Sequence, residues 1–236
     1  PKPSSAASDV YKRQFLHCLN CRRFANISNM IEVLYEDSDF LIVNKPSGLI
    51  VHATVDKSRE NLYDLLKKDH PELAILHRLD KDTSGAMLFS KNPEINKDIQ
   101  TIFDERTIEK TYIALVHGEW EGEKGTMEDF LKKEKVKNKE KMVKVLKGGQ
   151  KAITYFEKKD YKNGVSLMSF TLETGRMHQI RVQSALRNHP LLGDTFYGKA
   201  DKAERLFLHS HHLEFQFQGR LISVTAPLPA LFKQYF

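Results

Sequence analysis

The 236-residue chain is poor in the features that hold small secreted domains or membrane proteins together. It has only two cysteines, which cannot staple a domain of this size, so packing must hold the fold together. No apolar run approaches the ~20 residues that a membrane-spanning helix needs. The N-terminus lacks the apolar stretch and the small-residue cleavage site of a secretory signal. We therefore expect a cytoplasmic protein that is not embedded in a membrane.

The sequence is also poor in the ligand patterns of metal sites. Cys18 and Cys21 form a C-x-x-C, but a structural zinc site needs about four ligands and a second cysteine pair is missing. His209, His211 and His212 lie close together in the sequence, without an H-E-x-x-H motif or a nearby pattern of carboxylate ligands. The sequence therefore predicts no metal site.

Net charge is small except in one place. The chain has 37 Lys and Arg against 31 Asp and Glu, which gives a net charge of +6. Residues 132–147 contain eight lysines and two glutamates, so this one insertion holds the whole excess. Such a block attracts a polyanion, and an equally good interpretation is a solvated lysine loop that aids solubility.

Composition divides the chain into a leader and one folded domain. Residues 1–14 are rich in Pro, Ser and Ala with almost no apolar periodicity, and we expect residues 1–30 to be a disordered or irregular leader. Residues 31–236 carry the patterned segments and form one domain. The composition as a whole, 40% hydrophobic and 29% charged, is that of a globular protein and excludes disorder throughout.

Strand-like segments outnumber helical ones in this domain and do not alternate with them regularly. This order predicts an α+β fold with a mixed, largely antiparallel sheet and flanking helices. The expected strands are a pair within 31–48, a strand around 86–89, and others at 110–117, 152–157, 165–172, 213–217 and 221–225. The expected helices are 61–69, 92–103, 177–186 and 228–235, with Asn92 as an N-cap.

Two segments are dense in polar side chains that can carry chemistry. Residues 75–90 (ILHRLDKDTSGAMLFS) place a histidine, an arginine, a lysine and two aspartates within six positions, between apolar flanks. Residues 172–182 (LETGRMHQIRV) carry two arginines, and arginine forms two-pronged bonds to carboxylates and phosphates. On composition alone, each segment also fits a solvated surface loop whose charges pair with one another.

Five segments in a fixed order give the strongest signal in the sequence. They are EDSDFLIVNKPSGLIVH at 36–52, HRLDKDTSG at 77–85, EKTYIALVHG at 109–118, TGRMHQIRV at 174–182 followed by HPLLGDTFYG at 189–198, and LFLHSHHLEF at 206–215. In this order they resemble the motifs of the RluA-type pseudouridine synthases, and the resemblance covers about residues 31–236. One short motif would be weak, but five in the right order make an accidental match improbable.

The resemblance implies an activity and a fold. It implies the pseudouridine synthase catalytic fold and the isomerisation of uridine in ribosomal or transfer RNA to pseudouridine, without cofactor or metal. We expect the enzyme to be a monomer. Asp80, the aspartate of H-R-L-D, is then the nucleophile. A carboxylate can attack the sugar or base covalently, or abstract a proton to give a glycal, and the sequence leaves both routes open.

The resemblance also assigns roles to other residues. Arg181 is the cation that orients the carboxylate, and Tyr112, otherwise a plausible core tyrosine, stacks on the uracil. Arg78 fills the gap in the RNA stack when the uridine flips out. For the three histidines at 209–212, RNA contact or packing is the better interpretation. Further RNA contacts are expected from polar residues of the same motifs, namely His77, Arg176, His178, Gln179 and Lys45.

Two positions depart from the family pattern. The family usually has Thr or Ser where Met177 stands and His where Gln183 stands, so the RNA contacts around these positions are open. Larger relatives carry an S4-type RNA-binding module before the catalytic domain, and we expect residues 1–30 to be too short for one. Target choice would then rest on the catalytic domain and on residues 132–147.

Two other functions compete with the enzyme hypothesis. The lysine block and the two departures also fit a non-catalytic RNA-binding or folding factor on the same scaffold. A glycosidase using Asp80 and Asp82 fits poorly, because two carboxylates two residues apart would reach a suitable separation only by chance.

Overall fold

The structure is a computed structural model that describes residues 31–53, 56, 58–136, 139–198 and 201–236. One compact unit runs over Ile31–Phe236. The leader expected at 1–30, with Cys18 and Cys21, lies outside the described residues. Within the described ranges, no helix is long and apolar enough to cross a bilayer.

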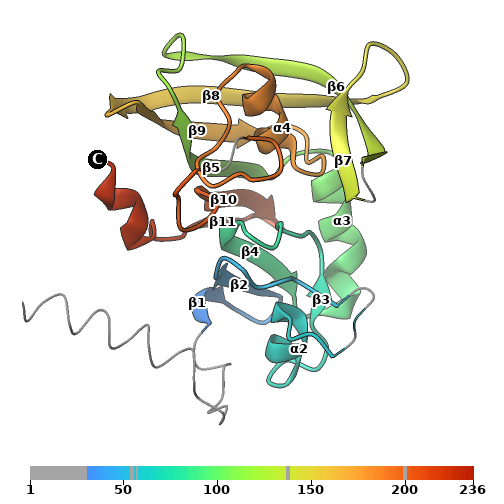
Figure 1. Cartoon of the computed structure of the whole chain (residues 1–236). Coiled ribbons are helices and arrows are strands. Elements are labelled where there is room, and N and C mark those ends of the chain that lie inside the picture. The colour runs from blue at the N-terminus through green and yellow to red at the C-terminus, as the bar shows by residue number, and fades with distance from the viewer. Residues whose placement is uncertain (1–30, 54–55, 57, 137–138, 199–200) are drawn as a thin grey trace, which may run out of the picture. The chain divides into compact units, whose positions relative to one another are not determined.

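Among the described residues, eleven strands form one mixed sheet in the order β1-β2-β4-β10-β5-β9-β8-β6-β7, with β3 on β4 and β11 on β10 (Figure 1). Only the β4–β10 pair is parallel among these ladders. The predicted α+β fold with a largely antiparallel sheet is therefore confirmed. The strands are β1 (Glu32–Glu36), β2 (Phe40–Lys45), β3 (Ala74–Ile75), β4 (Ser84–Ser90), β5 (Glu109–His117), β6 (Lys124–Val136), β7 (Lys139–Lys144), β8 (Gln150–Lys162), β9 (Val165–Leu172), β10 (Leu208–Phe217) and β11 (Arg220–Thr225).

Apolar side chains cover both faces of the central strands. In β2, Leu41 and Val43 face one core while Phe40 and Ile42 face the other, as the two-residue period of a strand requires. The first core also holds residues of α2 (Leu62–Lys67) and Ile180 of α4 (Gln179–Leu186), so these two helices share a face of the sheet.

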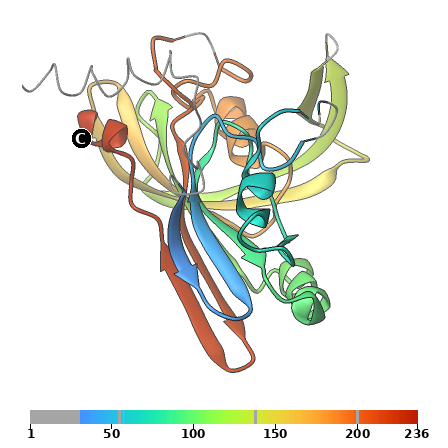
Figure 2. The same cartoon turned by 90° about the horizontal axis from the view of Figure 1, so that it is seen from below.

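The opposite face is covered by α3 (Asn96–Asp104), preceded by η2 (Pro93–Ile95), and near the C-terminus by η3 (Ala230–Gln234). Asn92 caps η2 through its side chain, as predicted, by accepting from the backbone N–H of Glu94. The helix expected at 228–235 is instead the single 3₁₀ segment η3. In Figure 2 the β10–β11 hairpin extends from one end of the unit, while β6 and β7 lie at the other end.

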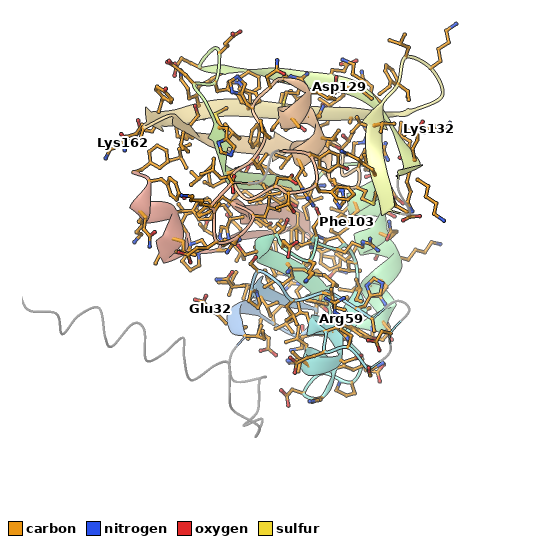
Figure 3. The ribbon with its side chains drawn as sticks, viewed as in Figure 1. Glu32, Arg59, Phe103, Asp129, Lys132 and Lys162 are labelled. Atoms are coloured by element: carbon orange, nitrogen blue, oxygen red, sulfur yellow. The ribbon has the colours of Figure 1, made fainter. Side chains whose placement is uncertain are left out.

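The lysine-rich residues 132–147 do not form the loop that was one interpretation of their composition. Most of them belong to an antiparallel hairpin of β6 and β7, in which Leu131 pairs with Lys144 and Lys133 with Met142. Leu131 and Met142 are buried against Val182 of α4, so a sparse apolar stripe anchors the hairpin while most of its lysines face outward. Residues 132–147 are called the lysine hairpin below; Lys132 is labelled in Figure 3.

Candidate active site

Two adjoining cavities, of about 520 and 340 Å³, share one wall. The residues that line only the larger cavity include Arg59, which is labelled in Figure 3, and Phe196. The smaller has a more apolar lining that includes Tyr112, Leu172 and Leu208. A charged cavity therefore meets a cavity whose walls suit a flat base. The residues common to both are Arg78, Leu79, Asp80, His178 and Arg181.

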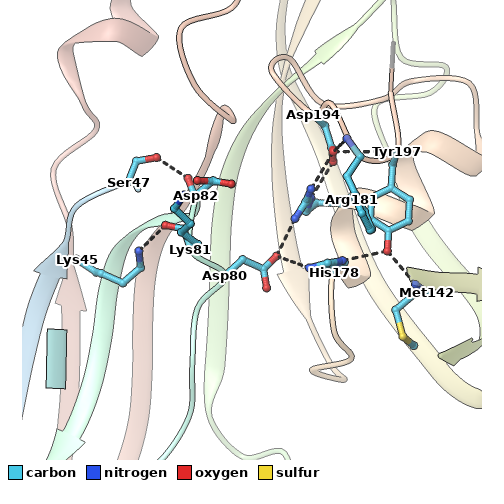
Figure 4. Close-up of polar contacts among 11 residues, drawn as sticks. Lys45, Ser47, Asp80, Lys81, Asp82, Met142, His178, Arg181, Asp194 and Tyr197 are labelled. Carbon is cyan, nitrogen blue, oxygen red and sulfur yellow. Dashed lines mark hydrogen bonds and ion pairs between the residues drawn. The ribbon is translucent and has the colours of Figure 1, made fainter. Parts of the chain in front are cut away.

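The loop that carries Asp80 joins β3 to β4 and is held by backbone contacts with the 45–49 turn (Figure 4). The amide of Gly48 donates to the carbonyl of Lys81 at 2.9 Å. The hydroxyl of Ser47 donates to the carbonyl of Asp82 at 2.7 Å. The carbonyls of Lys81 and Asp82, the two residues that follow Asp80, are thus both bonded to the turn, and these bonds fix the loop. The Asp80 side chain can therefore face the cavities without itself holding the loop in place.

Lys45 belongs to this support and not to an RNA-binding surface. Its side chain is fully buried, and its ammonium donates to the carbonyls of Pro46, Leu49 and Lys81 at 2.7–2.9 Å. Burial lowers the pKa of Lys45 to about 7, while the three carbonyls favour the protonated form because only an ammonium has three protons to donate. The predicted RNA contact by Lys45 is therefore wrong, since all three donors are used inside the protein.

Arg181, on α4, holds two aspartates at once. Its Nη1 lies 3.2 Å from Oδ2 of Asp80, while its Nε and Nη2 donate to the two carboxylate oxygens of Asp194 at 2.8 and 2.9 Å. Burial disfavours the charge on Arg181, but the bonds to Asp194 and Asp80 outweigh it and raise its pKa above the usual value. The structure thus places a permanent cation beside Asp80.

His178 approaches Asp80 from the other side. Its Nε2 lies 3.6 Å from Oδ2 of Asp80, and its Nδ1 lies 3.0 Å from the hydroxyl of Tyr197. Burial lowers the pKa of His178, so the ring is neutral at pH 7. His178 therefore presents a neutral, orientable polar group to Asp80, and it lines both cavities.

Tyr112 lies on β5 and lines the smaller cavity, which the loop that carries Asp80 also lines. It is only 8% exposed, and burial raises its pKa to about 12, so its hydroxyl stays protonated at neutral pH. The structure therefore brings Asp80, Tyr112 and Arg181 around one cavity, as the motifs imply.

Four of the predicted RNA-binding residues line the cavities, namely Arg78, Arg176, His178 and Gln179. Arg78 is exposed and reaches both of them. Arg176 lines the smaller one, and its Nε donates to the carbonyl of Lys151 at 3.1 Å. Both guanidinium groups retain donors for a ligand, because an arginine has five N–H groups.

His77 and Gln179 are used inside the protein instead. The His77 ring stacks on Phe103 at 5.3 Å and accepts from the backbone N–H of Leu88 at 2.9 Å; burial lowers its pKa to about 3. The amide of Gln179 makes four bonds to protein groups, which is its full capacity. The RNA contact predicted for His77 is therefore wrong, while Gln179 borders the smaller cavity with an amide that has no hydrogen-bonding capacity left for RNA.

The three histidines of β10 pack against neighbouring strands and loops. His209 bonds to Ser84 at 2.8 Å, and His211 bonds to the carbonyl of Ala226 at 2.8 Å. His212 bonds to the hydroxyl of Thr225 at 3.0 Å. In the part of the chain that the structure describes, no group of three or more His, Cys, Asp or Glu is placed to hold a metal ion.

Sequence reasoning missed Asp194 and Tyr197, which lie in the quoted HPLLGDTFYG segment but received no role there. Arg181 could have pointed to Asp194, because a buried guanidinium needs a second carboxylate when the first one shares only one oxygen with it. The departure at Gln183 is structural: its amide links α4 to Thr154 and Asp129, away from both cavities. Met177 does line the smaller cavity.

Comparison with known proteins identifies the family. Residues 39–186 match the family model described as RNA pseudouridylate synthase. The chain is 33% identical, over 99% of its length and 74% of the relative, to ribosomal large subunit pseudouridine synthase C of Buchnera aphidicola subsp. Schizaphis graminum. It is 36% identical, over 83% of its length and 86% of the relative, to an uncharacterized RNA pseudouridine synthase of Haemophilus influenzae.

A solved structure supports the fold. Human RNA pseudouridylate synthase domain containing 1 superposes with a TM-score of 0.75 at 24% identity, over 88% of this chain and 86% of that chain. The fold thus agrees with the family that the sequence matches identify. The chain therefore belongs to the RNA pseudouridylate synthase family, and it is an isomerase that converts uridine in RNA to pseudouridine.

Proposed function

We propose that this enzyme modifies uridine in the RNA of the large ribosomal subunit, with residues 31–236 as its catalytic domain and Asp80 as its nucleophile. The target is supported by several relatives named ribosomal large subunit pseudouridine synthase C, including one from Buchnera aphidicola subsp. Baizongia pistaciae at 39% identity over 91% of this chain. Transfer RNA as a target, a cytoplasmic location and a monomeric state stay predictions from the sequence.

The placement of Asp80 is the observation that carries the catalytic proposal. Its side chain is 27% exposed at the junction of the two cavities, with Arg181 on Oδ2. Within the described residues, no protein group donates to Oδ1 of Asp80, so this oxygen can meet a reacting atom. A carboxylate oriented by a guanidinium and open on one oxygen is what a nucleophile or a base at this position requires.

The reaction needs no atom from outside the substrate. The C1′–N1 bond of uridine breaks, the uracil turns, C5 bonds to C1′, and the proton lost from C5 is replaced by one on N1. Asp80 assists either by forming and then releasing a covalent bond or by removing and returning a proton. Both routes leave the carboxylate unchanged at the end.

The two cavities divide the work of binding. We infer that the extruded uracil enters the smaller cavity, where the ring of Tyr112 offers an aromatic face and its protonated hydroxyl can exchange a proton with the base. The larger cavity, with the guanidinium groups of Arg59 and Arg78, suits the negatively charged backbone on either side of the flipped nucleotide.

Tritium release from RNA labelled at C5 of uridine tests the proposal. We expect Asp80→Asn to release none above background, because an amide is neither a nucleophile of this kind nor a base. Asp98→Asn is the matched control, since it neutralises an exposed carboxylate on α3 that lines neither cavity, and it should release tritium like the wild type. Equal release by Asp80→Asn and wild type would remove Asp80 from the chemistry.

Two further outcomes separate the remaining alternatives. A wild-type protein that binds RNA but forms no pseudouridine would favour the non-catalytic factor. Mapping pseudouridine in cells that lack the gene tests the target, and we expect one or more positions of large-subunit ribosomal RNA to revert to uridine. Reversion in transfer RNA alone would reject the ribosomal target and leave the role of Asp80 intact.

A further inference from the structure

A chain of polar contacts joins the lysine hairpin to Asp80 (Figure 4). The backbone N–H of Met142, on β7, donates to the hydroxyl oxygen of Tyr197 at 3.0 Å. That hydroxyl lies 3.0 Å from Nδ1 of His178, and Nε2 of His178 lies 3.6 Å from Oδ2 of Asp80. Two side chains thus connect a strand of the hairpin with the proposed nucleophile.

The direction of the two hydrogen bonds of Tyr197 follows from which groups have protons. A backbone N–H can only donate, so the oxygen of Tyr197 accepts from Met142 and its single proton is available for His178. Burial raises the pKa of Tyr197 to about 12, which keeps that proton in place. Nδ1 of His178 then accepts, and a neutral imidazole must carry its proton on Nε2, the nitrogen that faces Asp80.

The groups around His178 shift its pKa in opposite directions, and their net effect favours the neutral form. Burial lowers its pKa, the carboxylates of Asp80 and Asp194 act in the opposite direction, and the guanidinium groups of Arg181 and Arg78 lower it further. A second proton, on Nδ1, would compete with the proton of Tyr197 for the space between the two side chains. The contacts therefore select one of the two neutral tautomers.

The backbone and the packing hold both rings in place. His178 has φ of 54°, a left-handed conformation that is costly for a residue other than glycine and is kept only where the surroundings enforce it. The Tyr197 ring lies edge-on to His178, with the guanidinium of Arg181 5.4 Å and the ammonium of Lys141 4.8 Å from its centre. Lys141 also donates to the carbonyl of Phe196 at 3.0 Å, a second tie between hairpin and site.

We propose that Tyr197 is a positioning residue that couples the lysine hairpin to the proposed nucleophile by fixing His178 in the tautomer whose Nε2–H faces Asp80. Arg181 and His178 then direct their donors to the same oxygen, Oδ2, and Oδ1 is left to the substrate. RNA that holds the hairpin in place would hold this arrangement too. The inference rests on the proposed roles of Asp80 and of the hairpin.

Tyr197→Phe removes the hydroxyl and keeps the ring. We expect the single-turnover rate of pseudouridine formation at saturating RNA to fall about tenfold, the effect of losing roughly one hydrogen bond. RNA affinity should stay within twofold, because β6 remains paired with β8 and Lys141 keeps its own tie. Tyr35→Phe is the matched control: it removes a hydroxyl bonded to Asp37 at 2.7 Å, outside both cavities, and should keep the wild-type rate.

The tautomer has a readout that does not depend on catalysis. In protein labelled with ¹⁵N-histidine, without RNA, His178 should show a proton on Nε2 and a bare Nδ1 in the wild type, and a mixture of tautomers in Tyr197→Phe. His178→Gln keeps an amide donor for Asp80 but has no imidazole whose tautomer Tyr197 could select. Adding Tyr197→Phe to His178→Gln should therefore cause no further loss of rate.

Several results would overturn the inference. They are a Tyr197→Phe rate within twofold of the wild type, a loss confined to RNA affinity, an unchanged tautomer in the variant, or additive losses in the double variant. Failure of the proposed function looks different, because there the wild type forms no pseudouridine or Asp80→Asn matches it. The histidine spectra would still show whether Tyr197 selects the tautomer of His178.

Discussion

Asp194 and Asp80 share one guanidinium but are held in different ways. The Asp194 side chain is fully buried, and Arg181 binds both of its oxygens. The backbone N–H groups of Phe196 and Tyr197 donate to the same carboxylate at 2.9 and 3.1 Å. The Asp80 side chain is 27% exposed and receives one bond from Arg181, at 3.2 Å. Both oxygens of Asp194 are thus taken up by protein donors, whereas Asp80 can still accept hydrogen bonds.

This difference separates support from chemistry. The pair with Asp194 orients the guanidinium whether or not Asp80 is present, so the cation is already in place when a substrate arrives. Burying Asp194 is tolerated because every charge is matched by close donors. Asp80 has fewer ties, which leaves one oxygen for the reacting atom. We therefore expect changes at Asp194 to act on stability and changes at Asp80 to act on rate.

The largest expected effect comes from Arg181→Met, which removes the cation from both carboxylates. Asp194 is then left buried and unpaired, so the free energy of unfolding should fall by ~3–5 kcal/mol, and pseudouridine formation should be lost. Urea unfolding and tritium release measure the two effects. Arg181→Lys restores the charge without the two-pronged geometry and should recover only part of the stability. A stability of Arg181→Met equal to wild type would show that Asp194 does not depend on this pair.

A smaller effect, with a defined pH dependence, is expected for Asp194→Asn. Burial raises the pKa of Asp194, but the bonds from Arg181 and the two backbone amides outweigh it and lower the pKa below the usual value. The unfolded chain therefore takes up this proton at a higher pH than the folded chain. The stabilisation is complete above about pH 4 and is lost as pH falls through the lower, folded pKa.

Urea unfolding between pH 3 and pH 6 measures this dependence. Asp194→Asn should be less stable than wild type by ~2–3 kcal/mol at pH 6, and the gap should narrow below about pH 4. Asp80→Asn should stay within about 1 kcal/mol of wild type at pH 6, since it gives up one exposed contact. A gap for Asp194→Asn that does not change with pH would contradict its role as a buried, paired carboxylate.

The sequence predicts the fold well where apolar periodicity is strong and poorly where it is sparse. β5 and β9 stand out because β-branched and apolar residues dominate them. The lysine hairpin does not, because lysines and glutamates occupy most of its exposed positions, and only Met142, together with the preceding Leu131, marks the inner face. These residues form strands because β6 pairs with β8 and packs on α4, which are contacts distant in sequence.

Motifs locate the site but do not tell which polar residues face the ligand. Asp80, Tyr112 and Arg181 come together around the smaller cavity as the motifs imply. Lys45 and Gln179 lie in the same motifs and instead satisfy buried protein groups. A polar residue in a motif can serve either purpose, and only the three-dimensional positions of unpaired carbonyls and hydroxyls decide which.

The smallest expected effect concerns RNA binding by the lysine hairpin, which contacts the segment that carries Asp194 and lies farther from Asp80. Replacing four of its lysines by Gln should make the slope of log K against log salt less steep by up to ~3. The slope changes by about 0.7 for each phosphate of single-stranded RNA that the protein no longer neutralises. Lys133 should contribute least, because Glu140 pairs with it. The rate at saturating RNA should stay within twofold. The four lysines replaced by Gln are Lys132, Lys133, Lys135 and Lys147.

A matched variant carries the same change in net charge outside the hairpin, on exposed lysines of the same chain. The control positions are Lys67, Lys68, Lys97 and Lys233. Because released counterions come only from phosphates that the protein contacts, the control should keep the wild-type salt slope. Equal slopes in the wild type, the hairpin variant and the control variant would place RNA away from the hairpin. A loss of rate at saturating RNA in the hairpin variant would mean that the hairpin lysines act on the surroundings of Asp80 as well as on binding.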